Sequence, residues 1–147
     1  TRLFLYDLAM AFELINGLRT VEFGNPGESR SNLIDLIVNG NKRATAGTLK
    51  WDYEAENEPI ETVGEKLAVV DNDNQHVATI QVTRAEVARF ADVPDEFALA
   101  EAEGDLNGDE FRAGHYKFWT DCGYAIDDET EIVLVYFDLV EDPRTTK

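Results

Sequence analysis

The sequence predicts a single α+β domain over residues 1–147, built on a mostly antiparallel, barrel-like sheet with helices around it. Four or five extended segments and four helical segments are expected, without the regular strand–helix alternation of a parallel sheet. Two apolar segments, at 66–70 and 77–83, flank a tight turn at 71–74, as in a β-hairpin. Apolar residues make up 44% of the 147 residues, enough for one core.

The N-terminal half is expected to begin with two helices. Residues 3–18 form an apolar segment whose Leu8, Phe12 and Ile15 fall on one side of a helix. A turn cluster at 24–27 separates it from a second helix at 31–38, which Gly40 ends. The buried face of this second helix comprises Leu33, Ile34, Ile37 and Val38. An extended segment at 44–49 and a polar, acidic loop at 54–65 follow.

In the C-terminal half, the second strand of the hairpin is expected to continue to residue 90. A short helix follows Pro94 and ends at Gly104. Asn107, with Glu110 three residues later, resembles a capping box for the next helix, which Gly123 ends. That helix carries a stripe of Phe111, His115, Phe118, Trp119 and Cys122. Residues 132–139 are long and apolar enough to form a central strand.

The charge balance constrains the partners. There are 30 acidic and 13 basic residues, giving a net charge of −17 and a pI of about 4.3. Such a field repels polyanions, and nucleic-acid affinity depends largely on neutralising phosphates. RNA is therefore a disfavoured partner, whereas a small neutral ligand meets no such repulsion. A surface acidic only for solubility or salt tolerance would have the same composition.

No metal, cofactor or membrane partner is expected. The sequence has two histidines and one cysteine, and it lacks HExxH, paired CxxC and a phosphate-binding glycine loop. The longest apolar run, 132–137, is far shorter than the ~20 residues of a spanning helix. A single cysteine forms no intramolecular disulfide, and the first residues lack the pattern of a secretion signal. We therefore expect a cytoplasmic protein.

The longest acid-free stretch is the sixteen residues between Asp35 and Asp52. It contains Lys42, with Thr45 three residues later, where the expected second helix gives way to a strand. A lysine beside a hydroxyl acts as its base when burial lowers the lysine's pKa, and a carboxylate orients such a lysine. An exposed basic turn would show the same short pattern, so these two residues alone leave both interpretations open.

Four separated motifs raise the significance of this stretch. They are "NGNKRATAGTLKWDYEAENEP", "VGEKLAVVD", "AEAEGD" and "FRAGHYKFW", in that order. Together they resemble the ASCH-domain family of the PUA-like superfamily over roughly residues 23–140, after an N-terminal helical extension. The resemblance implies a β-barrel flanked by helices, with a cleft that these motifs line.

The resemblance also implies a function. The superfamily is associated with RNA and modified nucleotides, and a small ASCH relative hydrolyses N(4)-acetylcytidine with a lysine, a threonine and a glutamate. By motif these fall on Lys42, Thr45 and Glu103, with Glu101 as the alternative carboxylate. The expected function is binding of a nucleoside or nucleotide and hydrolysis of an amide on a modified base. A non-catalytic RNA-binding module and a ribonuclease are the alternatives.

Further residues are candidates for binding the substrate. The aromatic rings of Trp51 and Tyr53 are able to stack on a base, although Trp51 is equally typical of a core. Arg112 is expected to hold a carboxylate such as Glu101 or Glu103. His115 lies on an apolar helix stripe, where a satisfied core histidine is common. The full set of expected binding residues is Arg43, Trp51, Tyr53, Glu101, Arg112 and His115.

Overall fold

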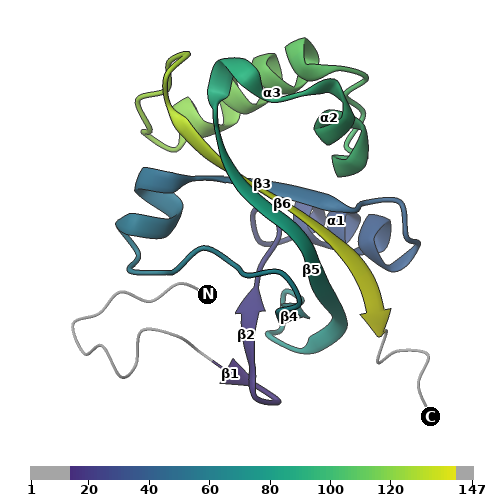
Figure 1. Ribbon diagram of the computed structural model, residues 1–147. Coiled ribbons are helices and arrows are strands. Elements are labelled where there is room, and N and C mark those ends of the chain that lie inside the picture. Colours follow the sequence, from purple (N-terminus) through teal and green to yellow (C-terminus); the bar gives the residue numbers. More distant parts are fainter. Residues whose placement is uncertain (1–13, 142–147) are drawn as a thin grey trace.

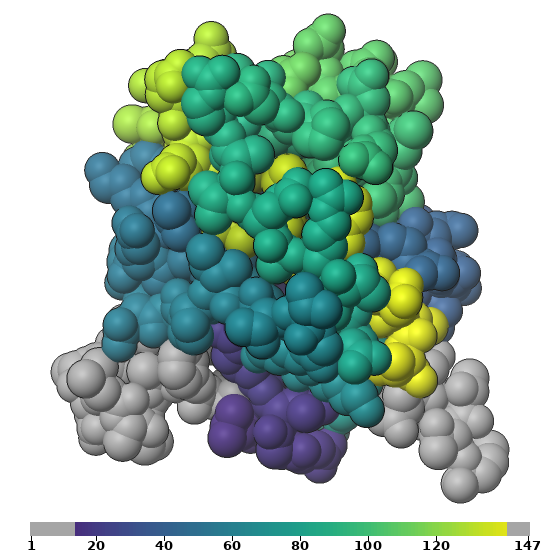
Figure 2. All heavy atoms as spheres, in the orientation of Figure 1, coloured from purple at the N-terminus to yellow at the C-terminus, as the bar shows by residue number. Residues whose placement is uncertain are grey.

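The structure, a computed structural model, describes residues 14–141. Six strands in this part of the chain form one sheet: β1 (Leu14–Ile15), β2 (Leu18–Val21), β3 (Ala44–Thr48), β4 (Lys66–Val70), β5 (His76–Arg89) and β6 (Glu131–Glu141). The helices are α1 (Glu28–Val38), α2 (Asp95–Glu101) and α3 (Gly108–Asp121), with a π-helical segment at Leu49–Glu54 and a 3₁₀ turn at Phe90–Asp92. The α+β class is confirmed, with α2 and α3 at the opposite end from the β1–β2 hairpin (Figure 1; Figure 2).

The sheet is mostly antiparallel, as expected. Its order is β1-β2-β4-β5-β6-β3, and only the β2–β4 pair is parallel. No ladder joins β1 to β3 within the described residues, so the expected barrel closure is not confirmed. Register shifts at Thr79/Ile80 and Val82/Arg84 interrupt the β5–β6 ladder, and such bulges bend a strand. Figure 1 shows β5 curving through the molecule beside β6.

The apolar sequence of β6 reflects burial on both of its faces. Successive residues of a strand point to opposite sides of the sheet. Val133, Val135 and Phe137 join the core that packs around α1, whereas Ile132 and Leu134 join a second core with α2 and α3. The strand lies between β5 and β3, which confirms its expected central place. The same sheet therefore supports two apolar layers.

The expected N-terminal helix is wrong where the structure describes it. Ile15 pairs with Leu18 across a two-residue turn formed by Asn16 and Gly17. Both turn residues have positive φ, 54° and 78°, which is the conformation that Asn-Gly favours between paired strands. The apolar residues of this segment have helical spacing, which favoured a helix over the hairpin that Asn16 and Gly17 indicate. Leu8 and Phe12, the other residues assigned to that helix, lie outside the described residues.

The remaining elements lie close to their expected positions. Helix α1 begins three residues earlier than expected, and the hairpin, β3, α2 and β6 fall in the predicted segments. Asn107 caps α3 by accepting a hydrogen bond from the Glu110 amide at 2.9 Å. The stripe on α3 is narrower than predicted, because Phe118 is 41% exposed and Cys122 is exposed. None of the helices in the described part of the chain has the length and apolar character needed to cross a bilayer.

Candidate functional site

A cavity of about 600 Å³ lies beside β3, one of the two edge strands of the sheet in the described residues. Its walls come mainly from two sides. One is the chain from the end of β2 into α1, and the other comprises β3, the π-helical segment, the turn that follows α2, and α3. Ligand pockets for small molecules span about 300–1,000 Å³, so this cavity has a suitable size. The acidic residues that line it are Glu22, Asp52, Glu61, Glu101, Glu103 and Asp105. Arg30 also lines it, but its guanidinium donates to the Phe23 and Gly24 carbonyls and lies 3.6 Å from Glu22.

The end of α2 is fixed against the start of β3. The Arg43 amide donates a hydrogen bond to the Ala100 carbonyl at 2.7 Å. Helix α2 then ends at Ala102, whose φ of 56° and ψ of 33° turn the chain left-handed. Because of this turn, Glu101 and Glu103, which flank Ala102 in the chain, both approach the side chain of Lys42.

Lys42 is the largest side chain of the described residues that is less than 2% exposed, with 1% of its surface exposed. Its ammonium donates to the Glu103 carboxylate at 2.5 Å, to the Ala44 carbonyl at 2.8 Å and to the Glu101 carbonyl at 3.4 Å. These three acceptors match the three protons of an ammonium group. Glu103 keeps 30% of its side chain exposed and lines the cavity, so it joins the buried lysine to the open space.

Glu101 is a buried carboxyl group with few partners. Its side chain is 2% exposed, and its Oε2 lies 4.0 Å from the Lys42 amine. Burial raises the pKa of Glu101 to about 8, although the charge of Lys42 opposes this rise. Among the described residues, none donates a hydrogen bond to its Oε1, which faces His115 Nε2 at 3.6 Å.

His115 reaches the cavity from α3. Its ring stacks on Phe111 with centroids 3.9 Å apart, and its Nδ1 lies 3.2 Å from the Phe111 carbonyl. Burial lowers the pKa of His115, which favours the neutral ring. Asp105 lies on the same side of the cavity, and partial burial raises the pKa of its carboxyl group.

Thr45 lines the cavity from β3. It pairs directly with Val135 of β6, and directly paired residues in an antiparallel ladder point to the same face of the sheet. Its hydroxyl is therefore on the α1 side of the sheet, with Val135. The structure brings Thr45, Glu101, Glu103 and His115 to one cavity, with Lys42 directly behind Glu103. The chemical roles expected for these residues stay predictions.

The two aromatic candidates differ in position. Tyr53 lines the cavity, and its hydroxyl donates to Glu61 at 2.9 Å. Trp51 is not a wall residue; it stacks on Tyr124 with centroids 4.8 Å apart and planes 6° apart. Tyr124 lines the cavity instead and donates to Asp52 at 2.9 Å. An aromatic surface therefore reaches the cavity through Tyr124.

Arg43 and Arg112 point elsewhere. Arg43 is exposed and pairs with Asp138 at 2.6 Å. Arg112 donates to the Val93 carbonyl at 2.9 Å and to Asp109 at 2.8 Å. The expected pairing of Arg112 with Glu101 or Glu103 is wrong, because the guanidinium instead ties α3 to the chain before α2. Neither arginine is among the residues that line the cavity.

Sequence reasoning missed Asp52, Asp105 and Tyr124. Asp52 accepts hydrogen bonds from the Thr48 amide at 2.8 Å and the Thr48 hydroxyl at 3.1 Å, which fixes the π-helical segment. A Thr followed four residues later by Asp, at the end of a strand, was the available signal for that turn. Asp105 and Tyr124 reach the cavity only through tertiary packing, which no local sequence pattern indicates.

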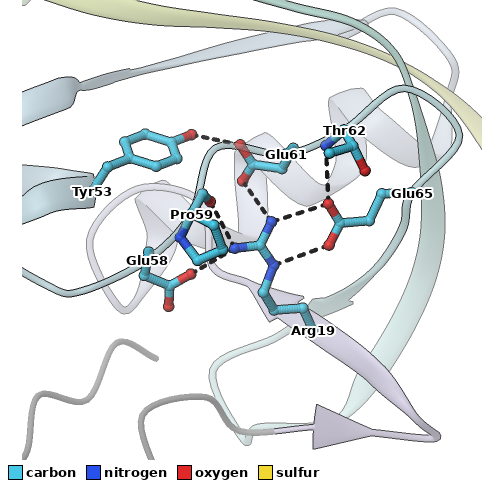
Figure 3. A network of polar contacts seen from close by, with 7 residues as sticks. All are labelled: Arg19, Tyr53, Glu58, Pro59, Glu61, Thr62 and Glu65. Atoms are coloured by element: carbon cyan, nitrogen blue, oxygen red, sulfur yellow. Dashed lines mark hydrogen bonds and ion pairs between the residues drawn. The ribbon is translucent and has the colours of Figure 1, made fainter. Parts of the chain in front are cut away.

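A network around Arg19 holds the loop at 54–65 in place (Figure 3). The guanidinium donates to Glu65 at 3.0 and 3.1 Å, to Glu58 at 3.0 Å and to the Pro59 carbonyl at 2.9 Å. It also lies 3.9 Å from Glu61, which accepts the Tyr53 hydroxyl. Since Glu61 and Tyr53 line the cavity, β2 and the loop together support this wall.

The fold is that of a known class of domain. The model of the ASCH domain family matches residues 19–141, and the chain belongs to that family. Its structure is similar to the ASCH domain from Lactobacillus crispatus JV V101, with 25% identity and a TM-score of 0.72 over 83% of this chain and 79% of that one. It is also similar to protein EF3133 from Enterococcus faecalis V583, with 26% identity and a TM-score of 0.72 over 82% and 75% of the two chains. No curated protein matches the chain.

Proposed function

We propose that the protein hydrolyses an amide on the base of a small nucleoside, such as N(4)-acetylcytidine, with Lys42, Thr45 and Glu103 as the reacting set. One observation carries the proposal: a fully buried lysine is joined to a carboxylate that lines a cavity of nucleoside-compatible size, and Thr45 lines the same cavity. Burying a charged pair is costly, and such pairs concentrate at functional sites.

The proposed chemistry starts from the ion pair. Because the three protons of the Lys42 ammonium already have acceptors, the amine must first pass one proton to Glu103. The neutral amine then takes the proton of the Thr45 hydroxyl while the oxygen attacks the acyl carbon. The departing amino group of the base receives a proton from the Lys42 ammonium. Water then gives a proton to the neutral Lys42 amine and attacks the acyl carbon of the Thr45 ester. The Lys42 ammonium returns a proton to the Thr45 oxygen as the carboxylic acid leaves, and Glu103 returns its proton to Lys42.

The charge around the cavity favours an uncharged ligand. Its lining carboxyl groups repel phosphate, and the guanidinium of Arg30 is held by two carbonyls and Glu22. Exposed arginines of the described surface, Arg84 and Arg89, lie against carboxylates at 2.9 and 2.8 Å. These features support a nucleoside in preference to a nucleotide or an RNA strand.

The proposal is tested with N(4)-acetylcytidine and the whole chain. Wild-type protein should release cytidine and acetate, which chromatography separates from the substrate. Thr45→Val removes the hydroxyl while keeping the β-branched shape, and it should abolish release; Thr45→Ser, which keeps a hydroxyl, should retain part of it. Equal rates for Thr45→Val and the wild type would exclude Thr45 as the nucleophile.

A further inference from the structure

Three side chains outside the proposed reacting set converge on one side of the cavity. Ligand atoms of Glu101, Asp105 and His115 all lie within 4.8 Å of one another, and all three residues line the cavity. They come from the end of α2, the turn after it and the second half of α3. A cluster of acidic residues alone is not evidence of a metal site. The protonation and the hydrogen-bond partners of each potential ligand atom therefore have to be considered.

The tautomer of His115 follows from its neighbours. Its Nδ1 lies 3.2 Å from the Phe111 carbonyl, and a carbonyl oxygen only accepts hydrogen bonds. Nδ1 therefore carries the proton, and in the neutral ring Nε2 presents a lone pair. A metal-binding histidine is held in this way, with its other ring N–H donated to a carbonyl or carboxylate.

The lone pair of His115 faces another acceptor. Glu101 Oε1 lies 3.6 Å from Nε2, belongs to a side chain that is 2% exposed, and receives no hydrogen bond from the described residues. Two acceptors that face each other in a buried place repel, unless a positive species lies between them. The charged neighbours that act on Glu101 are one cation, Lys42, and two carboxyl groups, Glu103 and Asp105, so carboxyl groups outnumber cations here.

We propose that Glu101, Asp105 and His115 form a binding site for a divalent first-row transition cation, with zinc the best match to one nitrogen and two oxygen donors. Zinc binds nitrogen and oxygen ligands at about 2.0–2.2 Å in a tetrahedron, which places ligand atoms about 3.4 Å apart. The separation of 3.6 Å between Glu101 and His115 is close to this value. The ligand atoms of the group lie at most 4.8 Å apart, so Asp105, in the partly exposed turn, has to approach the other two by at most about 1.4 Å.

Three protein ligands leave one position open, and that position faces the cavity. A site of this kind binds water or substrate in the fourth position. The ion would thus lie beside the Lys42–Glu103 pair and would contact any molecule in the cavity. This inference goes beyond the proposed amide hydrolysis and does not depend on it, because ion binding is measurable without turnover.

The test is calorimetric titration of the whole chain, freed of any affinity tag, with ZnCl₂, MnCl₂ and MgCl₂. Cys122 also lines the cavity, so all proteins carry Cys122→Ser to remove a competing ligand. We expect one zinc per chain, weaker binding of manganese and no measurable binding of magnesium. Glu101→Gln, Asp105→Asn and His115→Gln should each weaken zinc binding at least about tenfold. Asp105→Asn, in the partly exposed turn, keeps the test valid if a buried variant fails to fold.

Two control variants should leave zinc binding unchanged. His76→Gln removes the second histidine, whose ring bonds Thr79 and Asn16, and Asp121→Asn removes an exposed carboxylate of α3. Both should bind zinc like the parent. Absence of stoichiometric zinc binding in the parent would overturn the proposal. A proton between Glu101 Oε1 and His115 Nε2 would then account for their approach. Binding that survives Asp105→Asn and His115→Gln, or falls equally in His76→Gln, would overturn it as well.

Discussion

At the scale of single residues, Lys42 and its neighbour Arg43 show how burial gives two basic side chains different roles. Arg43 is half exposed and pairs with Asp138 on the surface, whereas Lys42 is buried and meets two carbonyls and Glu103. An ion pair in water contributes little, and a buried one leaves an uncompensated charge when either partner is removed. The two residues therefore form a natural pair for mutation.

Lys42→Met should lower the free energy of unfolding by about 2–3 kcal/mol, less than the largest losses for broken buried pairs because Glu103 can turn toward solvent. Arg43→Met, the neighbouring control, should cost much less. Urea denaturation followed by tryptophan fluorescence measures both. Equal losses would mean that the Lys42 pair has the energetics of a surface contact.

At the scale of elements, the left-handed turn at Ala102 is the feature that brings Glu101 and Glu103 to the same amine. A non-glycine residue in this conformation is strained by roughly 1–2 kcal/mol, and such strain concentrates at functional sites. Ala102→Gly should therefore raise stability by up to about 1 kcal/mol. The control Ala100→Gly, inside α2, should lower it by about 1 kcal/mol. Thermal unfolding of both variants decides the matter; a loss at position 102 as large as that at position 100 contradicts the strain.

The conformation of the loop at 54–65 depends on the ion pairs and hydrogen bonds of Arg19. Arg19→Met leaves the carboxylates of Glu58, Glu61 and Glu65 without their shared cation, and two of these are less than a tenth exposed. We expect a loss of about 3 kcal/mol and faster amide hydrogen exchange over residues 58–65. Arg89→Met, which removes an exposed arginine paired with Asp92 and Glu129, is the matched control and should cost far less. Unchanged exchange in the loop would refute this role of Arg19.

The sequence was most informative where local and tertiary signals agree. The apolar run of β6, the hairpin of β4 and β5, and the Asn107 cap were all predictable, because each rests on residues adjacent in the chain. The Asn-Gly hairpin at 16–17 was missed because apolar spacing suggested a helix. The family resemblance implied that a carboxylate, Glu103 or alternatively Glu101, lies beside Lys42. The positions of Asp105 and Tyr124 in the cavity wall depend instead on tertiary packing.

At the scale of the whole molecule, the net charge of −17 and the carboxyl groups of the cavity act in the same direction. Cytidine should bind at least about tenfold more tightly than cytidine 5′-monophosphate at low ionic strength, and the difference should shrink as salt screens the repulsion. Calorimetric titrations at two salt concentrations measure it. Tighter binding of the monophosphate, or sub-micromolar binding of single-stranded RNA at about 150 mM salt, would favour the RNA-binding alternative.

The most direct test of the central claim is the turnover of N(4)-acetylcytidine by wild-type and Lys42→Arg protein. Arginine keeps the positive charge beside Glu103 but does not give up its proton. Cytidine binding and thermal stability, measured in parallel, establish that the variant is folded, and Arg43→Lys serves as the control outside the cavity. We predict that the wild type hydrolyses the substrate, that Lys42→Arg loses at least about a hundredfold in kcat/KM, and that its cytidine binding persists. A wild-type protein without turnover, or a Lys42→Arg protein with undiminished activity, would contradict the assignment of Lys42 as the base.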